Sequence, residues 1–542
     1  MFLLQADYMK GKPTPDVPVC VIGCGPIGLA VSLLLSRHGV SVLLVERRGE
    51  LNTHPRSRFV DTNTMELMRE FGVEKMVEDS GLGPDWTACN RWSVDLATTP
   101  FAELESPTFL SVPGPDSPCL PVMTVQDEVE KALMTRVIDD PSISLHFDTE
   151  VVELTQTDAD TALILRDART DERRTVTAAY TLGADGPGST TRAVIGTALE
   201  SSPQPIHMQD VIFHADLSPY VGDRKGALLY TQPFEGVLVF QPLDGLRRWR
   251  CQVSIGQPDL ISEEAIRARI LASLGTSDDV GLDIVSMRMW QPTPGATTHF
   301  NHGRIFLVGD AAHVSVPTGG LGNNAGFSGA RNLAWKLAYV LRGLAPASIL
   351  DTYEEEHKPL ALERIEYGVV TTTVMGRMML GYRAGEDVGE HIEGTKRYAD
   401  YDYLLRGYEL SSELIAPNLE PAPELENPAR DFRPLVRNGW RAPHIWVDDA
   451  EAESVLDWYG NGYVLLVGPD CDAESWEVAV AALPDGAPIE VRRLPAERPI
   501  APYEADGVVL VRPDAVIAQH LSHASGTADL SAITPYLPTM AR

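Results

Sequence analysis

The chain has 542 residues, which is long enough for two to four domains of about 150 residues each. Acidic side chains outnumber basic ones by 76 to 45, so the formal net charge is −31. A polyanion of this size repels phosphate backbones and anionic bilayers, which argues against nucleic acid or membrane partners. No stretch resembles a membrane span or a secretory signal. We therefore expect a cytoplasmic protein whose six scattered cysteines are reduced thiols and bind no metal.

The first predicted elements form a dinucleotide-binding unit. A short apolar strand ends at Gly23, and Gly25 and Gly28 complete a G-x-G-x-x-G spacing. These glycines allow a tight turn, close approach of the backbone to a pyrophosphate, and close helix–strand packing. A helical apolar run and a second strand follow, and that strand ends in Glu46, which can accept hydrogen bonds from ribose hydroxyls. The segment predicts a Rossmann-type site for either FAD or NAD.

Two later segments favour FAD. Residues 180–192 contain a strand that leads into Asp185, and residues 303–313 contain a buried strand that leads into Asp310. Asp310 can accept hydrogen bonds from ribitol hydroxyls, and a glycine-rich loop follows it. The next helix begins near Asn324, where its dipole can stabilise negative charge on a reduced flavin. Either segment alone could be an ordinary strand–loop–helix crossover, but their order after the first motif favours the flavin.

These motifs resemble those of the single-component, FAD-dependent aromatic hydroxylases, the group A flavoprotein monooxygenases. Residues 23–28 resemble the FAD-binding turn of that family, Asp185-Gly186 its DG motif, and residues 309–313 its GD motif. His54-Pro55-Arg56 resembles a segment in which an arginine lies near the flavin, and Gln126 stands where the family has a glutamine near FAD. The expected FAD-binding residues are Gly23, Gly25, Gly28, Glu46, Arg47, Arg56, Gln126, Asp185, Asp310, Pro317, Gly320, Leu321, Gly322, Asn323 and Asn324.

The glycine-rich loop is similar to that of the phenol hydroxylase and aromatic polyketide hydroxylase branch. One departure follows it: the helix usually continues with a Gln-Asp pair, and this chain has Ser328-Gly329. We expect these two residues to lie close to the flavin edge and to alter the pocket there.

The middle of the chain predicts an antiparallel sheet. In residues 247–255, Trp249 and the alternate residues after it share one face, and Arg250 and Gln252 share the other. In the resembling family such a sheet covers the aromatic substrate. Tyr230, Phe240 and Trp249 are candidates for the substrate wall, although each could equally belong to the core of the sheet.

The expected fold class is α/β. A Rossmann-type FAD-binding domain comprises residues 1–200 and 287–365, and an antiparallel-sheet substrate domain is inserted at residues 201–286. A methionine-rich helical segment and linker, 366–430, leads to a C-terminal α/β domain, 431–542, that is similar to thioredoxin. That domain lacks a C-x-x-C motif, so a packing or dimer role is expected for it.

The resemblance implies that NADPH or NADH reduces the FAD and that O2 forms a flavin C4a-hydroperoxide, which hydroxylates a small phenolic or polyketide ring. No catalytic base is evident, and His313 is expected to have a structural role. A Baeyer–Villiger insertion or oxidative rearrangement is an alternative on the same fold, because only the pocket geometry differs. A non-catalytic flavin-binding homologue is an alternative of another class. We expect a monomer or a homodimer.

Overall fold

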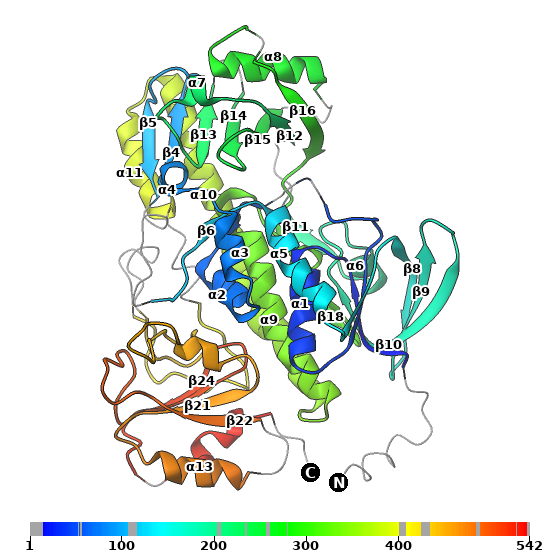
Figure 1. Ribbon diagram of the computed structural model, residues 1–542, viewed down its shortest axis with the longest axis vertical. Helices are drawn as coiled ribbons and strands as arrows, with labels where there is room; N and C mark the ends of the chain where they lie inside the picture. The colour runs from blue at the N-terminus through cyan, green and yellow to red at the C-terminus, as the bar shows by residue number, and fades with distance from the viewer. Residues whose placement is uncertain are drawn as a thin grey trace.

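The computed structural model describes residues 15–52, 54, 57–106, 116–202, 207–232, 236–255, 261–278, 280–399, 408–423, 434–483, 488–526 and 528–538. Arg56, which we expect near the flavin, lies outside the described residues. Figure 1 shows three parts, with an eight-stranded sheet and its helices in the middle, a seven-stranded sheet at one end and a four-stranded sheet at the other. No helix in the described part of the chain is both long and apolar enough to cross a bilayer.

The central sheet confirms the Rossmann-type prediction. Its main path runs β18-β19-β10-β1-β2-β7, and the β8–β9 hairpin extends β10. The strands are β1(Val17–Ile22), β2(Val42–Val45), β7(Ile143–His146), β8(Thr149–Gln156), β9(Thr161–Asp167), β10(Arg173–Gly183), β18(Asn301–His302) and β19(Ile305–Leu307). From β19 to β7 the neighbours are parallel. Such strands are covered on both faces, which explains why β2 is buried throughout.

Helices from distant parts of the sequence pack on this sheet. They include α1(Pro26–Arg37), α2(Thr62–Glu70), α3(Glu74–Asp79), α5(Gln126–Asp139), α6(Thr190–Val194) and α9(Leu321–Leu341). Both α5 and α9 pack against α1. Short strands complete this part of the fold: β3(Phe59–Val60) with β6(Val122–Met123), and β11(Leu199–Ser201) with β17(Gly295–Thr297) and β20(His313–Val314). The dinucleotide motif and the GD motif therefore belong to one core.

The second sheet has the order β16-β12-β15-β14-β13-β4-β5. Its strands are β4(Cys89–Ser93), β5(Ala102–Glu105), β12(His207–His214), β13(Leu228–Thr231), β14(Leu238–Pro242), β15(Arg248–Ile255) and β16(Asp283–Trp290). All neighbours are antiparallel except β4 and β13. Thus β4 and β5 come from within residues 1–200, and β16 continues past residue 286. These strands join because each edge of the sheet offers unpaired backbone groups.

Helices lie against both faces of the second sheet. The helix α8(Glu263–Leu274) packs on one face over an apolar core, with α4(Pro84–Thr87) and α7(Ser218–Val221) nearby. The long helix α10(Asp351–Ala384) and α11(Val388–Ala399) lie beside β4 and β5. The methionine-rich segment is helical, as the sequence predicts, and it fills a core, because Met375, Met378 and Met379 pack with Trp92.

The C-terminal domain has the sheet order β22-β21-β23-β24. The parallel strands β21(Tyr463–Val467) and β22(Ile489–Arg493) are joined by α13(Ala473–Ala481), and β23(Val508–Val511) and β24(Ile517–Leu521) are antiparallel. This arrangement is thioredoxin-like, as the sequence predicts. Cys471 is buried and unpaired, and the other five cysteines are also free thiols within the described residues.

Candidate functional site

The turn between β1 and α1 has the backbone geometry that a phosphate cradle needs. Gly23 has φ +105°, and a Cβ there would lie 2.5 Å from the carbonyl oxygen of Ala184. A Cβ on Gly28 would overlap the carbonyl oxygen of Gly23, whereas a Cβ on Gly25 would meet nothing within 4 Å. Gly25 is also the N-cap of α1 and supplies no side-chain cap. The first amides of α1 therefore face open space and could hold a pyrophosphate.

Glu46 lies beside this turn at the end of β2. Its buried carboxylate accepts hydrogen bonds from the backbone amides of Cys24, at 2.9 Å, and Arg48, at 3.0 Å. Each carboxylate oxygen can accept a second hydrogen bond, so Glu46 could also hold ribose hydroxyls. The neighbouring Arg47 is exposed.

Gln126 begins α5 and connects two parts of the candidate site. Its side chain donates to Glu130 Oε1 at 2.7 Å, so the two residues share a helix face. Its backbone amide donates to the carbonyl oxygen of Ser57 at 3.0 Å. Gln126 therefore ties α5 to the segment that follows the expected flavin arginine.

The two aspartates stand at the ends of β10 and β19. The carboxylate of Asp185 accepts from Ser189 Oγ at 2.5 Å and from the backbone amide of Thr191 at 3.0 Å, which fixes the start of α6. Asp310 is half-buried in the single turn after β19. At Gly309, with φ +59°, a Cβ would lie 3.0 Å from Ile27 of α1. The GD turn is thus packed directly on the first turn of the dinucleotide helix.

The glycine-rich loop leads into α9. Gly319 and Gly320 have φ +87° and +62°, and a Cβ on Gly320 would lie 2.7 Å from Cβ of Phe59. Gly320 is also the N-cap of α9 and leaves the first amides of that helix without a side-chain cap. Pro317 is exposed, Gly322 and Asn323 are half-buried, and Leu321 packs against Phe59. The loop could therefore present both its backbone and a helix dipole to a flavin.

Asn324 holds this loop in place. Its side-chain oxygen accepts from the backbone amide of Asp61 at 3.1 Å and from Thr64 Oγ1 at 2.8 Å. Its side-chain nitrogen donates to the carbonyl oxygens of Gly320, at 2.8 Å, and Phe59, at 3.2 Å. The buried amide thus uses its hydrogen bonds to join α9, the loop and α2.

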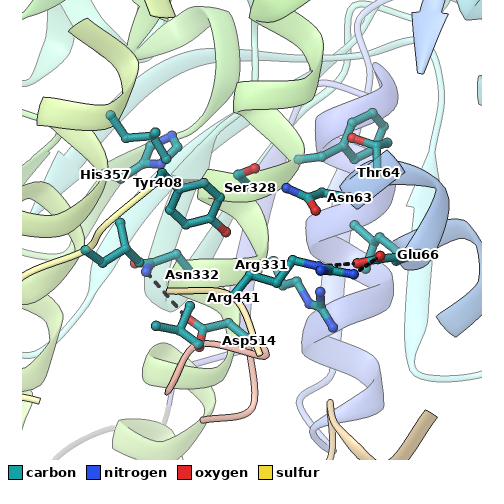
Figure 2. A pocket seen from close by; sticks show the side chains of 15 residues that line it. Asn63, Thr64, Glu66, Ser328, Arg331, Asn332, His357, Tyr408, Arg441 and Asp514 are labelled. Carbon is teal, nitrogen blue, oxygen red and sulfur yellow. Dashed lines mark hydrogen bonds and ion pairs between the residues drawn. The ribbon is translucent and has the colours of Figure 1, made fainter. Parts of the chain in front are cut away.

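Ser328 and Gly329, which replace the usual Gln-Asp pair, lie against α10 and the C-terminal domain. A Cβ on Gly329 would lie 2.5 Å from Nε2 of the buried His357, whose Nε2 is 3.3 Å from Nε2 of His313. Burial lowers the pKa of His313 to about 4, so this histidine is neutral and packs in the core. Figure 2 shows Ser328 with Tyr408 and residues of α2 and the C-terminal domain around a cavity of about 30 Å³.

Buried ion pairs dock the C-terminal domain on the FAD-binding domain. Arg512 donates to both oxygens of Glu356, at 2.7 and 2.9 Å, and Lys336 of α9 donates to the same carboxylate at 2.8 Å. Burial would raise the pKa of Glu356, but Arg512 and then Lys336 outweigh it and lower the pKa below its usual range. A second pair joins Arg441 Nε to Glu66 of α2 at 2.8 Å. The C-terminal domain therefore clamps the helix that carries the glycine-rich loop.

The three aromatic candidates for the substrate wall lie on two faces of the second sheet. Phe240 and Trp249 are fully buried in the core beneath α8, in edge contact with Phe213 and Trp86. Tyr230 lies on the other face and stacks on Trp92, with ring centroids 4.8 Å apart and planes at 3°. Only Tyr230 therefore faces the same side as the polar residues described next.

A buried polar strip crosses this other face of the sheet. Gln241 donates to Gln252 at 2.7 Å, Gln252 donates to Asp210 at 3.1 Å, and Arg250 forms an ion pair with Asp210. Burial opposes ionisation of Asp210, but Arg250 outweighs it and lowers the pKa of Asp210 to about 2. His54 lies above the strip, with Nε2 3.9 Å from Asp210. Sequence alternation placed Arg250 and Gln252 on one face but did not indicate Asp210, which pairs across strands.

A dinucleotide cradle covered by a second, partly polar sheet is the architecture of flavoprotein oxygenases, and the residues of the cradle fit FAD. Residues 16–366 match the family model described as FAD binding domain, and residues 436–535 match that of the aromatic-ring hydroxylase C-terminal domain. The chain belongs to the FAD-dependent aromatic hydroxylases. It is a monooxygenase that uses FAD, NAD(P)H and O2 on an aromatic substrate.

Three similar proteins illustrate the relationship. The chain is 31% identical to aklavinone 12-hydroxylase RdmE of Streptomyces purpurascens, over 95% of this chain and 97% of the relative. It is 28% identical to the tetracenomycin A2 monooxygenase-dioxygenase of Streptomyces glaucescens, over 93% of each chain. The crystal structure of the flavin-dependent monooxygenase PieE with FAD and substrate is 27% identical, with a TM-score of 0.84 over 94% of this chain and 98% of PieE.

Proposed function

We propose that the enzyme hydroxylates a phenolic, polycyclic ring of the polyketide type, held between the FAD cradle and the polar face of the second sheet. One observation carries this proposal: Phe59 contacts the glycine-rich loop, and His54, which lies close to it in the chain, contacts the sheet. Phe59 packs under Gly320 of the glycine-rich loop, and His54 Nδ1 is 2.7 Å from Ser286 Oγ on the sheet. The polar strip of the second sheet and the glycine-rich loop therefore lie close together. Two relatives support the same assignment: RdmE is named as a hydroxylase of aklavinone, and PieE is a flavin-dependent monooxygenase solved with FAD and substrate.

In this proposal the expected residues hold FAD as follows. The open amides at Gly25 bind the pyrophosphate, Glu46 binds ribose, Asp310 binds the ribitol chain, and the uncapped start of α9 faces the isoalloxazine. When bound and reduced by NADPH or NADH, FAD supplies the oxygen chemistry. Residues 1–200 and 287–365 thus serve FAD, and residues 201–286, extended by β4, β5 and the end of β16, cover the substrate.

The sheet residues position the substrate ring. The Tyr230–Trp92 stack offers a flat aromatic wall, and Gln241, Gln252 and Asp210 offer hydrogen-bonding groups in a buried setting. Buried polar groups discriminate strongly, because a ligand that cannot pair with them leaves them unsatisfied. A polycyclic ring with hydroxyl or carbonyl groups along one edge matches a wall of this kind.

The test is aerobic oxidation of NADPH and NADH by the purified flavoprotein with hydroxyanthraquinones. Anthraquinone without hydroxyl groups is the matched control. We expect faster NAD(P)H consumption with the hydroxylated rings and a product that contains one atom from isotopically labelled O2. Protein that retains no FAD, or products without labelled oxygen, would contradict the proposal.

The tetracenomycin relative favours a second candidate function, since its name includes both a monooxygenase and a dioxygenase activity. A product that contains two labelled oxygen atoms or an opened ring would assign this chain to that mode. We further propose that the enzyme is cytoplasmic, acts without nucleic acid or membrane, and is a monomer or a homodimer.

A further inference from the structure

Arg58 is a buried arginine between the glycine-rich loop and the second sheet. It directly precedes Phe59, which packs under Gly320. Its Nη1 donates to the carbonyl oxygen of Pro242 at 2.6 Å, and its Nη2 donates to that of Ala227 at 2.8 Å. These carbonyls adjoin β14 and β13, so the guanidinium is fixed across the end of the sheet.

Arg58 differs from Arg248 and Arg250 of β15 because its partners are neutral. Besides the two carbonyls, Nη2 lies 3.7 Å from the sulfur of Met123. Among the described residues, no carboxylate lies within ion-pair distance of Arg58. In contrast, Arg250 pairs with Asp210, and Arg248 lies 2.9 Å from Asp127. Arg58 therefore adds an uncompensated positive charge to a buried region.

The guanidinium stays charged in this setting and acts on a phenol of the protein itself. Burial lowers the pKa of Arg58 to about 9, which leaves it protonated at neutral pH. Burial raises the pKa of Tyr230 above its usual value, and the charge of Arg58 opposes that rise. Ala227, whose carbonyl oxygen accepts from Arg58, directly precedes β13, the strand that carries Tyr230, so the guanidinium lies at the end of the strand that bears the aromatic wall.

Asp210, the carboxylate described on this face, does not supply a base. His54 directs Nδ1 to Ser286, at 2.7 Å, and Nε2 towards Asp210. Asp210 is held by Arg250 and Gln252, and its pKa of about 2 makes it a weak proton acceptor. A cation beside the phenol offers a route to an electron-rich ring that does not depend on this carboxylate.

We propose that Arg58 stabilises the phenolate form of the substrate. The phenol O–H bond breaks, the proton passes to water, and the electron pair stays on the oxygen, where it activates the ring towards electrophilic oxygen. No oxidant or reductant takes part in this step. The inference rests on the proposed phenolic substrate and assigns Arg58 as the residue that sets its charge.

The experiment measures the pKa of a bound phenol without turnover. Alizarin, a hydroxyanthraquinone whose phenolate absorbs at longer wavelength than its phenol, is titrated in complex with the oxidised flavoprotein. An opposite charge within a few ångströms shifts a pKa by roughly one to three units. We expect the bound alizarin to have a pKa about one to two units below that of free alizarin. Arg58→Gln and Arg58→Met should remove this shift, and Arg58→Lys should keep most of it.

Arg267→Met is the matched control. Arg267 also donates to a backbone carbonyl, that of Leu282 at 2.7 Å, but it lies on α8 at the opposite face of the sheet. The Arg267→Met substitution should leave the pKa of bound alizarin unchanged. Flavin absorbance and the thermal midpoint verify that each variant is folded. A comparison of the pKa of bound alizarin in Arg58→Lys and Arg58→Gln separates the effect of charge from that of packing.

Two results would overturn the inference, and they are distinguishable. If alizarin binds and its pKa is the same in the wild type and Arg58→Gln, Arg58 does not set the charge of the substrate, while the proposed substrate class stands. If the wild-type flavoprotein binds neither alizarin nor other hydroxyanthraquinones, the polycyclic phenol assignment fails and the role of Arg58 fails with it.

Discussion

Replacing Gly329 by alanine should destabilise the protein by forcing a contact with His357. A Cβ at this position would lie 2.5 Å from Nε2 and 2.8 Å from Cδ2 of the imidazole. His357 is 1% exposed and also contacts His313, so a shift of the ring would disturb a second buried histidine. The structure therefore predicts that residues 329 and 357 are energetically coupled.

The expected magnitude follows from two opposing effects. Overpacking a filled core costs about 1–3 kcal/mol. Alanine in place of glycine inside a helix recovers about 1 kcal/mol. Gly329→Ala should thus lower the free energy of unfolding by up to about 2 kcal/mol in the wild type. In a His357→Ala background the obstacle is gone, and the same substitution should raise stability by about 1 kcal/mol.

The assay is urea unfolding of the wild type, both single variants and the double variant, followed by circular dichroism and by flavin fluorescence. The difference between the two backgrounds should be about 1–3 kcal/mol. Gly376→Ala is the control, because a Cβ at this exposed position in α10 would meet nothing within 4 Å. Additive effects of Gly329→Ala and His357→Ala would refute the reasoning.

Three further outcomes are expected. Gly28→Ala should lose both FAD and thermal stability, because its Cβ would overlap the carbonyl oxygen of Gly23. Gly25→Ala places its Cβ in open space, so this variant should fold and only bind FAD more weakly. The flavin-to-protein absorbance ratio and the thermal midpoint distinguish the two variants. Arg512→Leu leaves Asp514 buried without a cation and Glu356 with Lys336 alone, and it should cost about 3–5 kcal/mol in chemical denaturation. The exposed Arg493→Leu is its control, and equal losses would count against the ion-pair argument. Because the pKa of Glu356 is lowered in the folded state, its contribution to stability is complete above the unfolded pKa of about 4.3 and is lost as the pH falls below that value. Unfolding midpoints measured against pH should therefore fall less steeply in acid for Glu356→Gln than for the wild type.

The backbone geometry of the expected FAD cradle was predictable because it is local. A positive φ at Gly23 and the close packing at Gly28 require glycine whatever the rest of the chain does. Glu46 follows from the end of a short buried strand that lies beside the turn. Such features depend on a few consecutive residues, so the spacing of residues in the sequence predicts them.

The second sheet was predictable only in part because its contacts are not local. Alternation in 248–255 separates two faces correctly, yet it does not say which face meets the cofactor. Strands β4 and β5 join the sheet from a distant part of the chain, and Asp210 meets Arg250 across two strands. The role of Arg58 depends on carbonyls of Pro242 and Ala227, which no sequence pattern connects with it.

The helix α10 has a mechanical consequence. It is one continuous element of 34 residues, about 51 Å long at 1.5 Å per residue. Near its start Tyr353 donates to the carbonyl oxygen of Leu307 beside the flavin core, and near its end Met378 packs under the second sheet. In the proposed arrangement, this helix is held at both ends and sets the distance between the FAD-binding domain and the sheet that covers the substrate. We therefore expect the size of ring that the enzyme accepts to depend partly on α10. Enlarging the proposed substrate site by design would require a change in α10 as well as in the residues around the ring.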